Sequence, residues 1–328
     1  MQYNNILVIT LSSIGDCFLT LPAVDILRYL FHQAKITVMV GPRVAEIFQD
    51  NFFVDRVIIF DKYSGILNKI KLSLKLRADA YDLVIDFRNT AFPIFIKAKS
   101  KTNPFLITPK NIMHMKDRNL WRLQKVIKQA LPQDYKKSFS ATDRDIDYID
   151  TLLKEQGVTE GGKLIAVSPG AMSFLKRWTA QGFTDFCNLV LENYRAKIIL
   201  AGIGIDKDII EEVYAGIKKK VNVVNLYGKT SLRQLCALFK RCDLLLANDT
   251  GTAHLASYLD TPVLVICGPG DERRYGPWGR NGHTVRKYLA CAPCQKAECP
   301  FNTAACMKTL SGAQVFAKVK DILQSLNC

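Results

Sequence analysis

The chain lacks the features that mark secreted and membrane-spanning proteins. No stretch reaches the roughly 18 apolar residues that a membrane-spanning helix needs. The amino terminus, NNILVITLSSIGDCFLTLPA, has no positively charged segment before its apolar run, and Asp16 interrupts that run. A secretory signal has the opposite pattern. These absences predict a cytoplasmic protein.

A basic tail is also missing, although the 328 residues carry a formal net charge of +15. The basic residues are spread along the chain, with only short clusters at residues 97–101 and 218–220. Such a balance suits phosphate-bearing ligands or an anionic membrane surface. Nucleic acid is not expected as a partner, because no basic tail of the usual kind is present.

Short apolar runs alternate with longer helical segments, which predicts an α/β fold with parallel sheets covered on both faces. In the first half, the expected strands are residues 5–11, 36–40, 56–60, 83–86 and 104–107. A polar segment at 134–163 follows, and the rhythm then restarts with strands at 164–168, 197–201, 221–225, 243–247 and 262–267. We therefore expect two doubly wound domains, at residues 1–155 and 156–310. A terminal helix is expected within 311–328, packing back toward the first domain.

In such folds, ligands bind at the carboxyl ends of the strands. The stretch LLLANDTGTAHLAS places Asp249, Thr250, Gly251 and Thr252 between a buried strand and a helix that contains His254. Free N–H groups at a helix start, with a glycine that lets the ligand approach, suit a diphosphate. The alternative is an ordinary helix cap, in which Asp249 or Thr250 binds the amides of its own helix.

Two further loops follow strands of the second half. VSPGAMSFLKRWT contains Lys176 and Arg177. The lysine ammonium group is a compact charge and the arginine guanidinium group is a planar bidentate donor, and both bind phosphate well. AGIGIDKDII has the first two glycines of a dinucleotide fingerprint but Lys207 at the third position, which weakens an oxidoreductase interpretation. Asp206 or Asp208 remains available to accept a hydrogen bond from a ribose.

In order, these motifs resemble the bacterial ADP-heptose:lipopolysaccharide heptosyltransferases, a glycosyltransferase family with the GT-B fold. The resemblance rests on SSIGD, SPGA…KRW, NDTGTAHLA and PVLVICGP, and runs from Asn5 to about Met307. It implies two Rossmann-like doubly wound domains that face a central cleft, with the acceptor on the first and the nucleotide sugar on the second. It also implies an inverting glycosyltransferase that uses ADP-heptose and the lipopolysaccharide core.

The resemblance assigns roles by position. It makes Asp16 the catalytic base and Lys176 the group on the donor phosphates. It places the loop and helix start from Asp249 to His254 on the ADP-sugar. With the residues singled out above, the expected donor-binding residues are Ser13, Gly15, Arg177, Asp206, Asp249, Thr250, Gly251, Thr252 and His254. DFRNT, at residues 86–90, places Asp86, Arg88 and Asn89 toward the acceptor. No metal is implied for the diphosphate, and the DRDID acidic pair falls in the polar segment between the domains.

The sequence departs from the family pattern at three places. Thr179 stands where relatives often have proline, Thr252 lies at a variable position, and DFRNT lacks a glycine that several relatives carry there. The acceptor sugar is thus the least specified part. A different nucleotide-sugar donor, or a sugar-nucleotide or saccharide-binding protein without turnover, are the alternatives. Asp16 and Lys176 together argue against the second.

Two segments stand apart from the donor and acceptor motifs. ILNKIKLSLKLR, at residues 66–77, interleaves basic and apolar residues, which fits either transient contact with the inner membrane or a solvated helix with one core face. Near the end, Cys291, Cys294, Cys299 and Cys306 have the spacing C-x2-C-x4-C-x6-C. In a reducing compartment this favours a structural zinc or an iron–sulfur cluster over disulfides, with unliganded thiols as the alternative. The six other cysteines, Cys328 included, are expected to be buried thiols.

Overall fold

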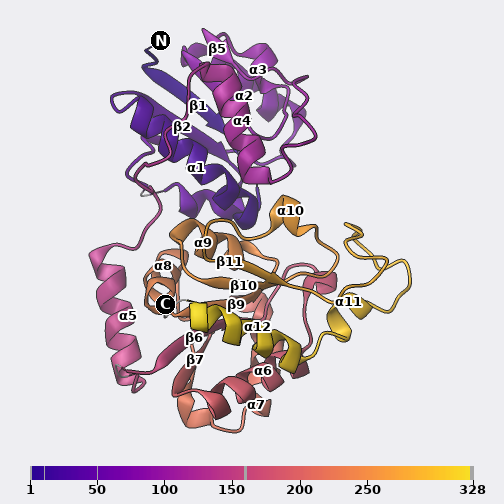
Figure 1. Ribbon diagram of the computed structural model, residues 1–328. Helices are drawn as coiled ribbons and strands as arrows, with labels where there is room; N and C mark the ends of the chain where they lie inside the picture. Colours follow the sequence, from indigo (N-terminus) through magenta and orange to yellow (C-terminus); the bar gives the residue numbers. More distant parts are fainter. Residues whose placement is uncertain (1, 11, 50, 159–160, 326–328) are drawn as a thin grey trace. The chain divides into compact units, whose positions relative to one another are not determined.

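The computed structural model describes residues 2–10, 12–49, 51–158 and 161–325. The chain forms two compact units, Met1–Phe139 and Ser140–Cys328. Each unit contains a parallel sheet with helices on both faces (Figure 1). The α/β class and the doubly wound organisation predicted from the sequence are confirmed. Residues 326–328 of the expected terminal helix, and with them Cys328, lie outside the described residues.

The sheet of the first unit has the order β3-β2-β1-β4-β5. Its strands are β1 (Asn5–Ile9), β2 (Lys35–Val40), β3 (Arg56–Ile59), β4 (Leu83–Asp86) and β5 (Ser100–Lys101). All neighbouring pairs are parallel. The chain winds outward from β1 through β2 to β3 and then crosses back to β4, so the switch point of the topology lies between β1 and β4. This is where such sheets bind ligands.

Helices cover both faces of this sheet because successive strand residues point to opposite sides. The helices are α1 (Ile14–Leu30), η1 (Pro42–Ile47), α2 (Ile66–Ala78), α3 (Phe92–Phe95) and α4 (Met115–Ile127). Leu7 and Ile9 of β1 join a core cluster with Leu76 of α2 and Phe92 of α3. Helix α4 packs on α1, where Asn119 Nδ2 donates to Leu19 O at 3.0 Å.

The sheet of the second unit repeats the plan in the order β11-β10-β9-β6-β7-β8. Its strands are β6 (Lys163–Ser168), β7 (Ala196–Leu200), β8 (Val223–Asn225), β9 (Leu244–Asn248), β10 (Val263–Ile266) and β11 (Gly282–Val285). The chain winds from β6 to β8 and crosses back to β9. The switch point therefore lies between β6 and β9, and the loops that follow these two strands should hold a ligand.

Helices α6 and α12 share one apolar cluster on a face of this sheet, and they lie side by side in Figure 1. The helices of this unit are α5 (Asp143–Glu155), η2 (Phe174–Lys176), α6 (Ala180–Asn193), η3 (Gly204–Asp206), α7 (Lys207–Gly216), η4 (Lys220–Asn222), α8 (Leu232–Arg241), α9 (Gly251–Leu259), α10 (Glu272–Tyr275), α11 (Ala305–Lys308) and α12 (Gly312–Ser325). The buried side of α12 is thus used within the second unit.

Two sequence predictions differ from the structure. The boundary lies at residue 139, not 155, because α5 packs on α8 through its apolar face and so belongs to the second unit. The expected strand at 104–107 is a turn, in which Leu106 N donates to Asn103 O at 3.0 Å and Phe105 N to Asn103 Oδ1 at 2.9 Å. Proline and asparagine favour such turns. The fifth strand is the shorter β5 instead.

Candidate functional site

The switch point of the second unit gathers most of the residues predicted to bind the donor. Lys176 and Arg177 follow β6, whereas Asp249 to His254 follow β9. The buried side chain of Asn248 joins the two loops: its Nδ2 donates to Pro169 O at 2.8 Å, and its Oδ1 accepts from Trp178 N at 3.0 Å. Asn248 was not among the residues predicted from the sequence to form the site.

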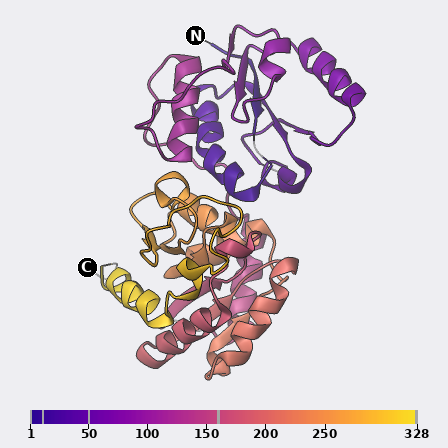
Figure 2. The ribbon, with the colours of Figure 1, turned by 90° about the vertical axis from the view of Figure 1, so that its right-hand side faces the viewer.

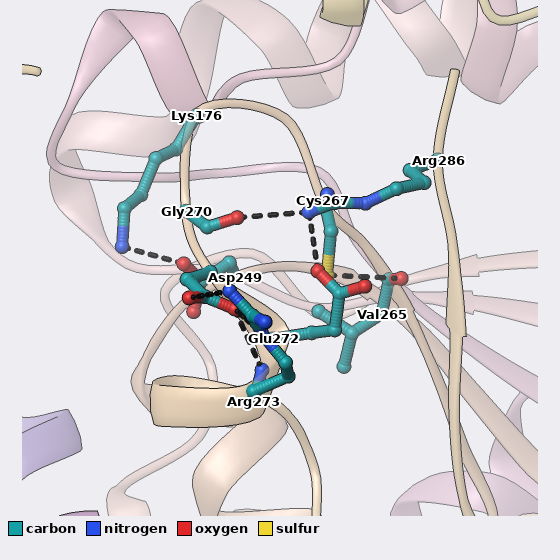
Figure 3. A network of polar contacts seen from close by, with 9 residues as sticks. Lys176, Asp249, Val265, Cys267, Gly270, Glu272, Arg273 and Arg286 are labelled. Atoms are coloured by element: carbon teal, nitrogen blue, oxygen red, sulfur yellow. Dashed lines mark hydrogen bonds and ion pairs between the residues drawn. The ribbon is translucent and has the colours of Figure 1, made fainter. Parts of the chain in front are cut away.

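Lys176 forms an ion pair with Asp249, with Nζ and Oδ2 2.6 Å apart (Figure 3). The Asp249 side chain is 8% exposed, whereas that of Lys176 is 35% exposed. The carboxylate is therefore fixed in the protein, while the ammonium group reaches toward solvent. A charge held this way can turn to a phosphate without large movement of the backbone.

The amino terminus of α9 lies next to this ion pair in the chain. Its N-cap residue is Thr250, yet within the described residues no side-chain hydrogen bond caps the helix there. The Thr250 hydroxyl instead bonds that of Thr252 at 2.9 Å, and Thr252 Oγ1 donates to Ser168 Oγ at 3.2 Å. The simple helix-cap alternative is thus not what the structure shows. Uncapped N–H groups on a nine-residue helix favour an anion.

The loop after β10 closes one side of Asp249. A Cβ added to Gly270 would lie 2.6 Å from Asp249 Oδ2, so a larger residue there would displace the carboxylate. Arg286, whose side chain is 8% exposed, donates from Nη2 to Gly270 O at 2.9 Å and forms an ion pair with Glu272 (Figure 3). This contact holds the glycine loop against the carboxylate. The sequence showed the loop as rich in glycine and proline but did not show its partner.

Asp206 lies against the loop after β6. A Cβ on Gly170 would come 2.0 Å from Asp206 Oδ1, so the carboxylate occupies the space above that glycine. Its Oδ2 accepts from Ile203 N at 3.0 Å, whereas the buried Oδ1 has no hydrogen-bond partner within the described residues. Burial raises the pKa of Asp206, against the opposing effects of the Ile203 N–H and Arg177. An unpaired buried acceptor suits a ligand hydroxyl.

Two predicted donor-binding residues, and Thr179 beside them, have partners within the protein. Arg177 Nε donates to Ala171 O at 2.7 Å, and its guanidinium lies over the Phe174 ring at 4.4 Å, so it holds its own loop. His254 is buried and stacks on Trp278 with ring centroids 5.9 Å apart. Thr179, which departs from the family pattern, caps α6 by accepting from Gly182 N at 3.0 Å.

In the first unit, Asp16 lies at the start of α1, directly after β1. Ser13 Oγ donates to Asp16 Oδ2 at 2.6 Å and accepts from Asp16 N at 3.2 Å. Within the described residues, Oδ1 accepts no hydrogen bond. Gly15 lies in the same first turn. The carboxylate is therefore oriented by one partner and keeps one oxygen for another.

The end of β4 lies beside the end of β1, since Asp86 pairs with Ile9. The Asp86 side chain is buried and accepts from Arg88 N at 2.7 Å and Thr90 N at 2.6 Å. Burial raises the pKa of Asp86, while these bonds and Arg122 oppose the rise. Asp86 thus shapes the loop, and Asn89, exposed with φ +54°, lies at its tip.

Two arginines of α4 were missed by the sequence analysis. Arg118 and Arg122 are one helical turn apart. Burial lowers the pKa of Arg122, the charge of Arg118 lowers it further, and the charge of Asp86 raises it. Arg122 makes no hydrogen bond or ion pair with any residue that the structure describes. Their i, i+4 spacing in the sequence was the available signal, but they lie on a helix rather than in a loop after a strand.

The cysteines divide into two groups. Cys17, Cys187, Cys236, Cys242 and Cys267 are buried free thiols, as predicted. The metal site predicted at the four later cysteines is not formed: across residues 2–325, except positions 11, 50, 159 and 160, no three His, Cys, Asp or Glu side chains are placed to hold an ion. The other three thiols of the group do add to burial in raising the pKa of Cys306.

Cys299 should react more readily than the buried thiols. Ala304 N donates to its Sγ at 3.4 Å, and this bond, with the N–H groups of Phe301 and Thr303, lowers its pKa to about 7. Burial instead raises the pKa of Cys236 and Cys267 to about 12. Because the thiolate is the nucleophile, iodoacetamide should label Cys299 with a midpoint near that pKa.

Peptide mass spectrometry across a pH series measures this labelling in the folded protein. Cys236 and Cys267 should remain unlabelled until the protein unfolds, and Cys299→Ser should remove the early product. Equal labelling of Cys299 and Cys306 at neutral pH would contradict the proposed effect of the N–H donors.

Comparison with known proteins identifies the family. The model of glycosyltransferase family 9 (heptosyltransferase) matches residues 69–305. Lipooligosaccharide heptosyltransferase 2 of Campylobacter jejuni subsp. jejuni (NCTC 11168) is 27% identical over 318 residues, covering 95% of this chain and 96% of that protein. Among solved structures, E. coli ADP-heptose lps heptosyltransferase II has a TM-score of 0.77 at 19% identity, covering all of both chains.

Two other solved structures bear on ligands. E. coli WaaC with ADP-2-deoxy-2-fluoro heptose has a TM-score of 0.70 at 19% identity, covering 97% of this chain and 99% of that one. The iron-containing TibC of enterotoxigenic E. coli has a TM-score of 0.61 at 13% identity, covering 99% and 77%. At these identities the likeness shows the fold alone, which is GT-B. Because the family model covers more than half of the chain, the protein belongs to glycosyltransferase family 9, the heptosyltransferases.

Proposed function

We propose that this glycosyltransferase moves a heptose from ADP-heptose to the inner core of a lipopolysaccharide, with inversion at the anomeric carbon. The observation that carries the proposal is the Lys176–Asp249 ion pair together with the uncapped start of α9. Together they place the Lys176 ammonium group, which Asp249 neutralises until a ligand binds, and the partial positive charge of a helix start at a topological switch point. The names of the relatives, which include ADP-heptose and lipopolysaccharide, support the choice of substrates. We place the reaction in the cytoplasm.

In the proposed donor site, the diphosphate lies at the start of α9, and the Lys176 ammonium group donates hydrogen bonds to its oxygens. Thr250, Gly251 and Thr252 supply N–H groups and hydroxyls. Asp206 Oδ1, buried and unpaired among the described residues, accepts a hydrogen bond from the ribose. Asp249 positions Lys176 rather than touching the phosphates, because like charges would repel. Charge stabilisation of the leaving group thus needs no divalent cation.

The transfer itself is a single displacement. An acceptor hydroxyl attacks the anomeric carbon, the bond from that carbon to the diphosphate oxygen breaks, and ADP leaves with the bonding electrons. Asp16 takes the hydroxyl proton, with Ser13 orienting its carboxylate. The Asp86 loop and the half-buried Arg122 bind the acceptor. The guanidinium group of Arg122 can bind a phosphate group of the acceptor through two parallel hydrogen bonds.

Titration calorimetry with ADP, GDP and UDP tests the donor. ADP should bind most tightly, with the same affinity with and without magnesium. Lys176→Met should weaken ADP binding about 10- to 100-fold, because it removes a charged hydrogen-bond donor. Lys163→Met is the matched control, since Lys163 also pairs with an aspartate, Asp243, at 2.9 Å in the same unit. Preference for GDP or UDP would replace the donor, and absence of binding would contradict the proposal.

Asp206→Asn should separate stability from binding. Because the folded state raises the pKa of Asp206, its charge costs stability at neutral pH, and that cost disappears as pH falls toward the ordinary carboxyl range. The variant should therefore melt at or above the wild-type temperature at pH 7, with the difference shrinking in acid. ADP should bind about tenfold more weakly.

Asp208→Asn provides the comparison for Asp206→Asn, since Asp208 is exposed two residues away and was the other candidate for the ribose. Its melting temperature and ADP affinity should match those of the wild type. Loss of ADP binding in Asp208→Asn but not in Asp206→Asn would reassign the ribose contact.

Asp16→Asn should lower the transfer rate by at least about 10²-fold and leave ADP affinity unchanged, because a general base contributes to the chemical step. The amide can still accept the Ser13 hydrogen bond, so the helix start is preserved. Asp117→Asn is the matched control, because Asp117 has the same first-turn position in α4. The measurement is ADP release in the presence of acceptor. Undiminished transfer in Asp16→Asn would rule out Asp16 as the base.

A further inference from the structure

Helix α2 has two apolar stripes, and the core uses only one of them. Leu76 is buried in the core and Leu72 packs against it. The second stripe consists of Ile66, Ile70 and Leu74, spaced by four residues, with Leu67 beside it. These four side chains are 74%, 50%, 61% and 70% exposed, respectively. Helices of soluble proteins normally place polar residues on the side away from the core, so this stripe needs another explanation.

Helix α3 extends the exposed apolar area. Its Phe92 joins the same core cluster as Leu76, so α2 and α3 cover the same face of the sheet, and they contact each other. Ile94 and Phe95 of α3 are 55% and 58% exposed. We call Ile66, Leu67, Ile70, Leu74, Ile94 and Phe95 the α2–α3 surface. In Figure 2, the purple helix at the right-hand edge of the first unit is α2.

The charge around this surface has one sign. Residues 62–78 and 87–116 contain eleven lysines and arginines and no aspartate or glutamate. Lys71 and Lys75 lie one turn apart next to the apolar stripe. Among the flanking carboxylates, Asp79 pairs with Arg56 and Asp82 with Lys99, whereas Asp61 is exposed and forms no ion pair with any residue that the structure describes. An exposed apolar stripe beside an excess of positive charge suits a partner in which an apolar layer lies next to an anionic one.

We propose that the α2–α3 surface docks on an anionic phospholipid bilayer. Helix α2 would lie in the plane of the interface, with its exposed stripe among the acyl chains and Lys71 and Lys75 at the headgroup phosphates. At about 1.5 Å per residue its 13 residues span about 20 Å, too short to cross a bilayer. No helix in the described parts of the chain is long and apolar enough to do so.

A second copy of the chain fits this surface less well. Face-to-face pairing would bring two lysine-rich, carboxylate-free surfaces together, and like charges at close range oppose association. Anionic lipid satisfies both layers of the surface instead. The proposal does not depend on the identity of the sugar donor, although a lipid-anchored acceptor would make such docking useful.

Vesicle cosedimentation of the full-length protein tests the proposal. The probes are vesicles of phosphatidylcholine alone and of phosphatidylcholine with phosphatidylglycerol. Wild type should bind the anionic vesicles, with binding falling as salt rises. Ile70→Ser/Leu74→Ser and Lys71→Glu/Lys75→Glu should each weaken that binding at least about tenfold. All four side chains are exposed, so both variants should fold.

Two control variants carry the same chemical changes elsewhere. Lys318→Glu/Lys320→Glu alters two exposed lysines of α12, and Val221→Ser alters a side chain that is 82% exposed in the second unit. Both should bind vesicles like the wild type. ADP affinity, and transfer to a lipid-free acceptor, should be unchanged in both α2 variants, which keeps a failed docking test distinct from a failed proposal on function.

Three results would overturn the proposal. The first is equal binding to neutral and anionic vesicles, and the second is equal loss in the control variants. The third is concentration-dependent dimerisation in sedimentation velocity that Ile70→Ser/Leu74→Ser abolishes, because a second copy would then be the occupant of the surface.

Discussion

The side-chain amide of Asn248 joins the two loops from which the second unit builds its site. It is fully buried, and its donors and its acceptor are all engaged by backbone groups of residues 169, 170 and 178. These bonds fix the loop that carries Lys176 relative to the end of β9, which Asp249 directly follows. The short ion pair between Lys176 and Asp249 therefore depends on a neutral residue that touches neither charge.

Two glycines add a steric condition to this arrangement. Gly170 leaves the space that Asp206 fills, and Gly270 leaves the space beside Asp249. In both cases a carboxylate from one loop lies over the bare backbone of another, so the positions of the acids are set by packing as well as by charge. Lys176 is neutralised by Asp249 in the absence of a ligand, and a diphosphate must offer it a better partner than a carboxylate already in place.

The fold could be predicted from the sequence where a signal repeats. The buried strands and amphipathic helices recur through both halves, and α2 (Ile66–Ala78) coincides with the segment of interleaved basic and apolar residues at 66–77. Signals that occur once were less reliable. The apolar run at 104–107 resembled a strand, yet Pro104 and Asn103 made it a turn. The segment containing α5 was polar enough to resemble a linker, and only its packing on α8 assigns it to the second unit.

In the site, too, the sequence indicates residue types but not the contacts that those residues make. The motifs lie in loops that follow strands, as expected, because the alternation of strands and helices indicates where each strand ends. The strand order that brings these loops to the two switch points came from the structure. The motifs could not show which side chains the protein itself occupies. Asp86 and Arg177 bind their own loops, whereas Arg122, on a helix with no motif, makes no hydrogen bond or ion pair with the described residues and interacts with Asp86 only at longer range. Which polar group remains available to a ligand is decided by tertiary hydrogen bonds, and those depend on residues such as Asn248 that carry no chemistry of their own.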